Sequence, residues 1–412
     1  MFARNYVTDP AYGVPFLSSS SALHAELTYA DLLRAQDANS ARLAPLRIEE
    51  GMTLVVRSGT IGRMTYARPE MSGMWSSEHL LKVVPNPVLV RPGYLYAFLS
   101  GRFGIPLVVG ETYGAIVQHI EPGHISDLPV PLAPDGIQDD AHRLVTEAAE
   151  MRTWASAELR AVIREIEEAA GLPPLDIRYA SARPDTSLVK ASTLRGRMDG
   201  LFHSNYHQQA LAPIHRLPEN RRATVGELAS RVFWPPMFKR IRVEDPRYGA
   251  PFFGTAALMR ADPDASYLLS GRTSGFEDLF VDQTTVLVPA SGQLNGIIGH
   301  AVLPHGAVVG GSVTHHAIRV FCRDEAVAGY LVACLSSEYA RRQLKARAYG
   351  SSIPSLDESR VAGVILPRLD KAHMDVLGRR AFAARTARHD AVYKEREARA
   401  LVELWIERQG AA

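Results

Sequence analysis

The amino-acid sequence contains one pattern twice, and this repetition constrains the fold more than any other feature. VTDPAYGVPFL at 7–17 matches VEDPRYGAPFF at 243–253, and we call the step from Val7 to Val243 the repeat offset. The same offset pairs YLYAFLS, which begins at Tyr94, with YLVACLS, which begins at Tyr330. Self-similarity at one fixed spacing is the signature of a duplicated structural unit. The sequence therefore predicts two tandem copies of one module.

Both copies show the same order of expected elements. A front half with alternating apolar and polar residues, broken by Gly, Pro and Ser, predicts short strands and turns, as in MTLVVRSGTIGRM at 52–64. A short apolar helix follows at 92–101 and again after Glu325, and each copy then closes with a Pro-rich segment. The predicted fold class is α+β, with two β-rich modules that are each followed by a long helix.

The two long helices are predicted from apolar residues that recur every three or four positions after Gly136 and Gly378. Their many alanines allow close approach, so we expect the two helices to pack as an antiparallel, coiled-coil-like pair with pseudo-twofold symmetry. The alternative, that each helix only covers its own sheet, stays open. The stripe residues that we expect to bind a partner are Leu144, Met151, Leu159, Ile166, Val402 and Trp405.

The repeat also predicts where the domains begin and end. Residues 1–134 form the first module and 135–172 the first long helix, whereas 173–369 form the second module with its lead-in and 370–410 the second long helix. The first copy has no counterpart of residues 173–236. We therefore expect the first module to lack its opening segment, either because it borrows structure from elsewhere or because its start is truncated.

Composition excludes several classes of protein. Hydrophobic residues make up 46% and charged residues 22% of the chain, which suits a folded protein with a sizeable core. No apolar run is long enough to cross a membrane, no secretion signal stands at the start, and two cysteines are too few for a disulfide framework. We therefore expect a cytoplasmic protein without a membrane partner. Residues 173–260 are rich in Lys and Arg, as expected for a surface that contacts phosphate.

Motifs for catalysis or cofactor binding are missing from the sequence. It contains no GxGxxG after a strand, no GxxxxGK[ST] and no G-x-S-x-G. The histidines at 300, 305, 315 and 316 invite a metal site, but their spacing matches no metal motif. We expect no metal, no cofactor and no catalytic residue in this chain. An enzyme that uses these histidines, and a scaffold that binds only protein, remain as alternatives.

The repeated motifs resemble the specificity (S) subunit of type I restriction–modification systems. The first copy has a GTIGR-like turn at Gly59–Arg63, which is degenerate in the second copy as SGQLNGIIGH from Ser291. Both copies have the apolar helix and then a run ending in Pro, such as YGAIVQHIEPGHISDLPVPLAP from Tyr113. TVGELASRVFWPPMFKR at 224–240 is similar to the opening of a recognition domain. The likeness covers almost the whole chain.

This resemblance implies a non-catalytic DNA-binding role in phage defence. Two target-recognition domains would each read half of a bipartite, asymmetric site in double-stranded DNA. The long helices would act as a spacer and dock two methyltransferase (M) subunits, which hold S-adenosylmethionine and flip the target base. A motor-nuclease (R) subunit can join such a complex. A divergent specificity subunit of another DNA-modification defence system is a further alternative.

Candidate DNA contacts are polar residues in the loops of both copies, because Arg, Asn, Gln and Ser side chains match the hydrogen-bonding groups of base edges and phosphates. In the first module they are Arg57, Ser58, Thr60, Arg63, Ser76, Ser77, His79, Tyr113 and Gln118. In the second module they are Ser291, Gln293, Asn295, His315, His316, Tyr349, Ser351 and Ser352. The candidates for phosphate contact are Lys239, Arg240 and Arg242.

Overall fold

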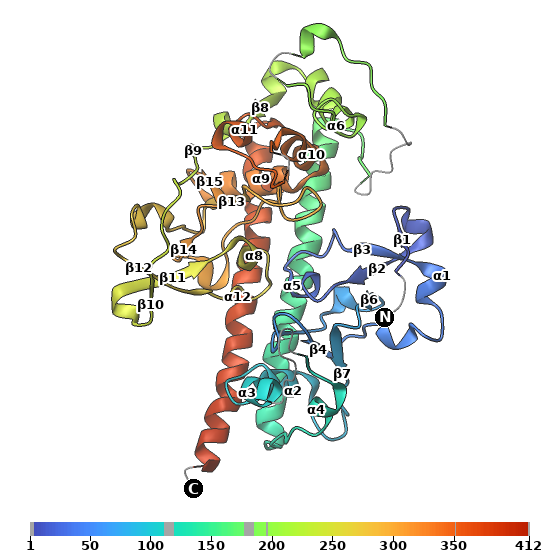
Figure 1. Ribbon diagram of the computed structural model, residues 1–412, viewed down its shortest axis with the longest axis vertical. Coiled ribbons are helices and arrows are strands. Elements are labelled where there is room, and N and C mark those ends of the chain that lie inside the picture. The colour runs from blue at the N-terminus through green and yellow to red at the C-terminus, as the bar shows by residue number, and fades with distance from the viewer. Residues whose placement is uncertain (1–3, 111–118, 177–184, 195–196, 351, 411–412) are drawn as a thin grey trace. The chain divides into compact units, whose positions relative to one another are not determined.

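The computed structural model describes residues 4–110, 119–176, 185–194, 197–350 and 352–410 (Figure 1). The chain divides into two compact units. Unit 1 contains residues 1–156 and 387–412, and unit 2 contains residues 157–386. Each unit therefore holds one β-rich module together with part of each long helix, α5 (Asp135–Ala170) and α12 (Lys371–Gly410).

Unit 1 contains two small sheets. Their strand orders are β1-β3-β2-β6 and β5-β4-β7. The strands are β1 (Tyr6–Val7), β2 (Gly13–Leu17), β3 (Asp31–Arg34), β4 (Thr53–Val56), β5 (Met64–Tyr66), β6 (Trp75–Ser76) and β7 (Leu80–Val83). The shorter helices are α1 (Ala35–Ala38), α2 (Pro92–Leu99), α3 (Gly104–Gly110) and α4 (Pro122–Ser126).

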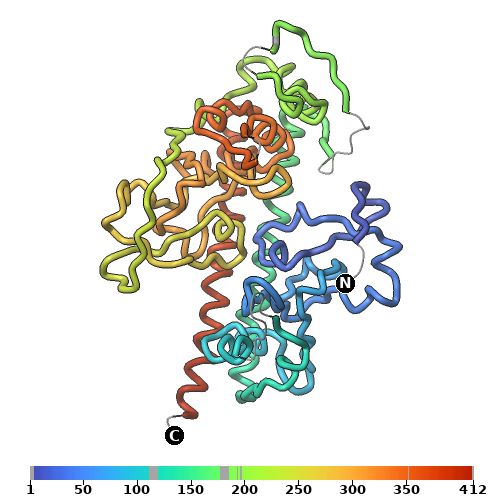
Figure 2. Tube along the Cα trace, in the orientation of Figure 1, coloured from blue at the N-terminus to red at the C-terminus, as the bar shows by residue number. Residues whose placement is uncertain are grey.

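Unit 2 contains three small sheets, in the orders β10-β12-β11-β14, β13-β15-β9 and β16-β8. The strands are β8 (Arg222–Thr224), β9 (Arg231–Phe233), β10 (Arg242–Val243), β11 (Gly249–Phe253), β12 (Tyr267–Ser270), β13 (Thr285–Pro289), β14 (Ser312–Val313), β15 (Ala317–Phe321) and β16 (Ile365–Pro367). The helices are α6 (Asn205–Arg216), α7 (Val225–Leu228), α8 (Thr255–Leu258), α9 (Glu325–Ser336), α10 (Glu338–Arg347) and α11 (Glu358–Ala362). In Figure 2 the green trace of α6 lies beside α10, which it contacts.

The two units repeat one topology, which confirms the predicted α+β fold with two β-rich modules, each followed by a long helix. β1, β2 and β3 begin one repeat offset before β10, β11 and β12, and the two sheets have equivalent strand orders. The only parallel pairing among the described strands is also repeated, since β2 pairs with β6 and β11 pairs with β14. The repeat offset likewise relates α4 to α11.

Glycine marks the place where the short apolar helix crosses the long helix in each unit. A Cβ on Gly93 of α2 would lie 2.7 Å from the Cα of His142 in α5. The equivalent Gly329 of α9 approaches Gly378 of α12, where a Cβ would lie 1.9 Å from the carbonyl oxygen. These contacts are far too close for any side chain, so both crossings require glycine at positions that the repeat offset relates.

The next residue along each apolar helix anchors the Pro-rich closing segment. The Tyr94 hydroxyl donates to the Pro131 carbonyl at 2.5 Å, and the Tyr330 hydroxyl donates to the Pro367 carbonyl at 2.9 Å. Both tyrosines are fully buried. The duplication therefore preserves a specific hydrogen bond as well as the backbone path.

The antiparallel pairing of α5 and α12 is visible within unit 1. Lys394 pairs with Glu147 at 2.5 Å, and Arg388 donates to Ser156 at 3.1 Å, so a later position on one helix meets an earlier one on the other. Apolar side chains of both helices share one core with α2, including Ala141, Leu144, Val145, Ala398 and Val402.

The stripe residues predicted to bind a partner are wholly or partly buried in the chain. Leu144, Leu159, Ile166 and Val402 are buried, whereas Met151 and Trp405 are half-buried. Leu144, Val402 and Trp405 belong to the core of unit 1. Their role in binding a partner stays a prediction.

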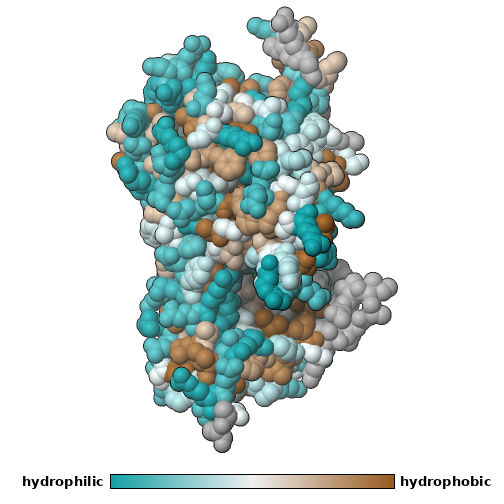
Figure 3. All heavy atoms as spheres, turned by 90° about the vertical axis from the view of Figure 1, so that its left-hand side faces the viewer, coloured by the Kyte–Doolittle hydropathy of each residue, from teal (hydrophilic) through white to brown (hydrophobic). Residues whose placement is uncertain are grey.

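The exposed surface drawn in Figure 3 is mostly hydrophilic, with separate hydrophobic patches. None of the helices in the described part of the chain combines the length and the hydropathy needed to cross a membrane.

Candidate functional site

Three loop segments of unit 1 meet at one end of the β5-β4-β7 sheet. The N–H of Arg57 donates to the His79 carbonyl at 2.9 Å, and the N–H of Ile120 donates to the Arg57 carbonyl at 3.1 Å. Residue 57 is therefore held between residues 79 and 120. Two residues further on, Gly59 has a φ of 85°, which glycine adopts without strain, and the turn exposes Thr60 at its tip.

Unit 2 repeats this meeting of three segments. The N–H of Ala290 donates to the His316 carbonyl at 2.7 Å, and the N–H of Leu356 donates to the Ala290 carbonyl at 2.7 Å. Positions 57 and 290 are thus equivalent, so the loops that follow them are equivalent too. The predicted correspondence between the turn at Gly59–Arg63 and the segment that begins at Ser291 is confirmed.

The polar side chains of the unit 1 loops largely bond to one another. The Ser58 hydroxyl and Nδ1 of His79 are 2.8 Å apart. Nε of Arg57 donates to the Ile120 carbonyl at 3.0 Å, and its guanidinium also pairs with Glu121. The Arg57 side chain is half-buried, so it stiffens the loop cluster as well as lining it.

Other predicted residues of unit 1 lie deeper. Ser76 and Ser77 are both buried: the Ser76 hydroxyl donates to the Leu46 carbonyl at 3.3 Å, and that of Ser77 accepts from the N–H of His79 at 3.1 Å. Both serines are interior because Ser76 belongs to β6, which pairs with β2, and Ser77 follows it directly. Arg63 is half-buried. Tyr113 and Gln118 lie outside the described residues.

In unit 2 the polar loop residues are more exposed. Gln293, Asn295 and Ser352 all face solvent, and Nε2 of Gln293 donates to the Ser352 carbonyl at 3.3 Å. The hydroxyls of Ser291 and Ser355 are 3.2 Å apart, which ties the two loops together. Ser351 lies outside the described residues.

Tyr349 extends this loop surface. The residue is 42% exposed, and the Arg360 guanidinium lies 4.2 Å from the centroid of its ring. Backbone hydrogen bonds in both directions between Tyr349 and Ser355 fix its position. An exposed aromatic ring with a stacked guanidinium is a surface on which a planar group can stack.

His315 and His316 form the most distinctive cluster of unit 2. Their rings are 4.0 Å apart, and the His315 ring also meets Phe238 edge to face at 5.3 Å. The carbonyl of His315 accepts a hydrogen bond from the Trp234 indole at 2.7 Å. His315 is only 6% exposed, yet neither of its ring nitrogens has a hydrogen-bond partner among the described residues.

The electrostatics of this cluster favour a neutral imidazole at His315. Burial, His316 and Arg240 together lower the pKa of His315 to about 4, and burial and Arg240 also lower the pKa of His316. Buried polar atoms normally have hydrogen-bond partners, and an unpaired one is costly. A ligand that offers oxygen or nitrogen atoms to His315 would remove this cost.

The predicted phosphate-contact residues lie at the surface beside this cluster. Lys239, Arg240 and Arg242 are all exposed. Arg240 is held 5.5 Å from the centroid of the Phe252 ring, and Arg242 is held 4.5 Å from that of Tyr267. Aromatic packing thus orients two guanidiniums without neutralising them.

In unit 1 the cation at the equivalent position is neutralised. Arg4, which is equivalent to Arg240, also lies 5.5 Å from a phenylalanine ring, that of Phe16. However, Arg4 forms an ion pair with Glu78 at 2.8 Å, whereas the position equivalent to Glu78 is His315 in unit 2. The same scaffold therefore carries a neutralised pair in unit 1 and an excess of positive charge in unit 2.

A buried cation behind the loops was not found from the sequence. Arg319 of β15 is fully buried and donates to the carbonyls of Val313 at 2.6 Å and Thr314 at 2.8 Å. The equivalent Lys82 of β7 donates to the Ser76 hydroxyl at 3.1 Å. Burial lowers the pKa of Arg319 to about 10 and that of Lys82 to about 8. The sequence feature that could have identified both residues is a single cation within an otherwise apolar strand, as in LLKVV and AIRVF.

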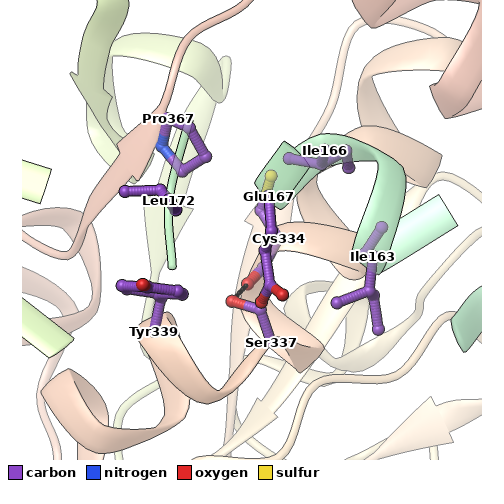
Figure 4. A pocket seen from close by; sticks show the side chains of 9 residues that line it. Ile163, Ile166, Glu167, Leu172, Cys334, Ser337, Tyr339 and Pro367 are labelled. Carbon is purple, nitrogen blue, oxygen red and sulfur yellow. Dashed lines mark hydrogen bonds between the residues drawn. The ribbon is translucent and has the colours of Figure 1, made fainter. Parts of the chain in front are cut away.

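No alternative catalytic or metal site stands out in the described part of the chain. The described residues contain no group of three or more His, Cys, Asp or Glu side chains that could hold a metal. A small cavity of unit 2 is lined mainly by apolar groups, with Glu167, Cys334 and Ser337 among them (Figure 4). Burial raises the pKa of Cys334 to about 12, so its thiol is not a ready nucleophile.

Comparisons with known proteins yield structural matches only. No protein-family model and no curated protein matches the sequence. The chain is similar to a type I restriction–modification system S subunit from M. genitalium, with 12% identity, coverage of 98% of this chain and 90% of that one, and a TM-score of 0.29.

Two further solved structures are similar over comparable lengths. One is described as the structural basis of complex assembly and conformational transition of the type I R-M system, with 15% identity, 98% and 94% coverage and a TM-score of 0.28. The other is the HsdS subunit from Thermoanaerobacter tengcongensis, with 14% identity, 98% and 93% coverage and a TM-score of 0.27. Because these TM-scores are far below 0.5, we base the proposal below on the duplication within the chain.

Proposed function

We propose that this chain is a non-catalytic, sequence-specific DNA-binding subunit of a type I restriction–modification complex. In this proposal each unit reads one half of a bipartite, asymmetric site in double-stranded DNA. The observation that carries it is the charge difference at equivalent loop positions, where Arg4 is paired with Glu78 and Arg240 lies beside His315. One scaffold with two different polar surfaces suits two different half-sites, whereas a single active site would need only one such surface.

The side chains divide by role in this proposal. Lys239, Arg240 and Arg242 contact phosphates, because exposed cations give affinity without sequence preference. Thr60 in unit 1 and Asn295 in unit 2 contact base edges, because both are exposed on loops that the sheet holds in place. Ser76 and Ser77 support the loop from inside the unit.

The long helices supply the proposed docking surface for methyltransferase subunits, which would carry the S-adenosylmethionine. Since the apolar stripe is used within the chain, we assign docking to the outer faces of the helices. Trp154 of α5 is 48% exposed, and Tyr393 and Leu404 of α12 are 48% and 52% exposed. Large exposed apolar side chains of this kind are typical anchors of protein interfaces. Recruitment of a motor-nuclease subunit is part of the same proposal.

The test is selection of bound sequences from a random pool of duplex DNA with the purified full chain, together with affinity measurements across salt concentrations. We expect two short conserved blocks separated by unspecified bases. Thr60→Ala should relax one block and Asn295→Ala the other. Lys239→Ala should reduce the slope of log affinity against log salt by about 1, and Lys371→Ala, an exposed lysine of α12, should leave it unchanged.

Two results would contradict the proposal. One is a single continuous motif that both loop variants alter together. The other is the absence of salt-dependent affinity for duplex DNA, which would favour the protein-binding scaffold.

A further inference from the structure

The two units differ in the group that lies beside one arginine. In unit 1 the Arg4 guanidinium donates to the Glu78 carboxylate at 2.8 Å. In unit 2 the equivalent arginine is Arg240, and His315 takes the position of Glu78, because both residues follow the parallel strand pairing at the same step. Both arginines lie 5.5 Å from the centroid of equivalent phenylalanine rings, so the duplication preserves their placement. Arg240 forms no ion pair with any described residue, so its charge is not neutralised.

The next histidine along the chain has also changed its surroundings. In unit 1 the Ser58 hydroxyl lies 2.8 Å from Nδ1 of His79. The equivalent of His79 in unit 2 is His316, since the carbonyls of both accept the same backbone hydrogen bond. The equivalent of Ser58 is Ser291, whose hydroxyl lies 3.2 Å from that of Ser355 instead. The His316 ring therefore lacks the partner that its counterpart has in unit 1.

His315 brings a buried donor to the same place. The residue is only 6% exposed, and neither ring nitrogen has a hydrogen-bond partner among the described residues. The neighbours whose charge shifts its pKa are His316, Arg240 and Arg319, and all three lower it. Whichever ring nitrogen of the neutral imidazole carries the proton can donate it to an acceptor. An anion beside Arg240 and His315 would therefore accept a buried hydrogen bond in a region of positive charge.

The cluster reaches the surface, and its rim is cationic. Lys239, Arg240 and Arg242 are exposed, and His316 is half-buried. A phosphate offers several acceptor oxygens, so a guanidinium and an imidazole can bond to it at the same time. The additional cations favour a phosphate that belongs to a polyanion, since neighbouring phosphates then meet cations of their own. These features favour a phosphate of a nucleic acid over a single carboxylate.

We propose that Arg240, His315 and His316 form a phosphate-binding site of unit 2, at the place where unit 1 holds the carboxylate of Glu78. That carboxylate closes the equivalent place in unit 1 from within the chain. The inference rests on the proposed function for the source of the phosphate, which is the DNA backbone, whereas the site itself follows from the comparison of the two units. A phosphate contact of this kind fixes the register of the DNA on unit 2.

The first measurement tests the site without DNA. The full chain, with its histidines labelled at ring carbon Cε1, is titrated with sodium phosphate and followed by NMR, with sodium chloride at matched ionic strength as the reference. We expect the signals of His315 and His316 to shift saturably with phosphate only. Arg240→Gln should abolish the saturable shift, and it should fold because the arginine is exposed.

The second measurement exchanges the two units' side chains and follows the affinity for duplex DNA across salt concentrations. His315→Glu supplies Arg240 with an internal carboxylate, so it should weaken binding at least tenfold and lower the slope of log affinity against log salt by about 1. Glu78→His releases Arg4, so it should tighten binding and raise the slope by about 1. The double variant should return the slope to that of the natural chain.

Two further variants control for charge and for folding. His373→Glu makes the same replacement at an exposed histidine of α12 in unit 2, and we expect it to leave the slope unchanged. His315→Gln removes the imidazole without adding a charge, and we expect a smaller loss of affinity than from His315→Glu. If thermal melts show that neither variant of His315 folds, Glu78→His still tests the exchange in unit 1.

The outcomes separate this inference from the proposed function. Salt-dependent binding of duplex DNA that neither His315→Glu nor Glu78→His alters would overturn the site and leave the proposed function standing. Saturable phosphate binding by a chain that does not bind duplex DNA would support the site and overturn the DNA backbone as the source. A saturable shift with oligoglutamate but not with phosphate would overturn the phosphate site in favour of an acidic protein segment.

Discussion

The ion pair between Arg152 of α5 and Glu395 of α12 allows a direct test of how the long helices are held together in unit 1. Their side chains are only 5% and 2% exposed, and the Tyr96 hydroxyl donates to Glu395 at 3.3 Å. The pair therefore joins both helices and α2 in a region that water does not reach. We expect its two charges to be strongly interdependent.

The magnitude follows from burial. Arg152→Met would leave Glu395 as a buried carboxylate with only the Tyr96 hydroxyl as a described partner, and removal of one member of a buried pair typically costs about 3–5 kcal/mol. The double variant Arg152→Met/Glu395→Met removes both charges and should cost much less than the sum of the single variants. Arg143→Met serves as the control, because the Arg143–Glu147 pair is exposed and such pairs contribute about 0–1 kcal/mol.

The assay is urea unfolding followed by tryptophan fluorescence. Three of the four tryptophans, at 75, 154 and 405, belong to unit 1, so the signal reports mainly on that unit. The four free energies of unfolding form a double-mutant cycle. A single-variant loss below about 1 kcal/mol, similar to that of Arg143→Met, would refute the inference that the pair is buried and coupled.

Two further predictions concern unit 2 and the long helices. Gly378→Ala should lower the free energy of unfolding by at least about 1–3 kcal/mol, because the new Cβ would lie 2.0 Å from the Ala326 carbonyl oxygen. Gly136→Ala has nothing within 4 Å of its new Cβ and should stabilise its helix by about 0.5–1 kcal/mol. Thermal melts of both variants test these two expectations. Burial and Glu338 raise the pKa of Glu167 from 4.5 to about 7, so the folded chain binds the extra proton between these values and its stability falls as pH rises through them. Glu167→Gln should therefore be more stable than the natural chain at pH 8, on the order of 2–3 kcal/mol, and equal to it at pH 4; a gain that is the same at both pH values would contradict this.

The overall architecture was predictable because its signals are periodic. A constant repeat offset requires two similar modules, and apolar residues at every third or fourth position require a helix with one buried face. Both signals survive many substitutions, since they depend on the pattern and not on individual residues. The surface that the apolar stripe packs against was not predictable. Residues such as Leu144 and Ile166 recur at the same helical spacing whether they pack against this chain or against a partner.

The roles of individual polar residues were less predictable. Ser76 and Ser77 look like loop residues in the sequence, but the parallel strand pairing beside them places both inside the unit. Arg57 looks like a free cation, but it is held by Glu121, which lies 64 residues further along the chain. Such contacts depend on three-dimensional packing between distant segments. Only the exposed positions, such as Asn295 and Lys239, could be assigned to the surface from local character alone.

The lengths of the loops show where the two modules have diverged. The repeat offset holds for β1–β3, is shorter between Arg57 and Ala290, is longer between His79 and His316, and returns to its first value between Ile120 and Leu356. One change in length falls between β3 and β4, and another falls between Arg57 and His79, in the loop segment of the candidate surface. A duplicated scaffold that keeps its strand order, while the loops of the candidate surface differ in length and charge, is expected when the two modules bind different partners through one architecture.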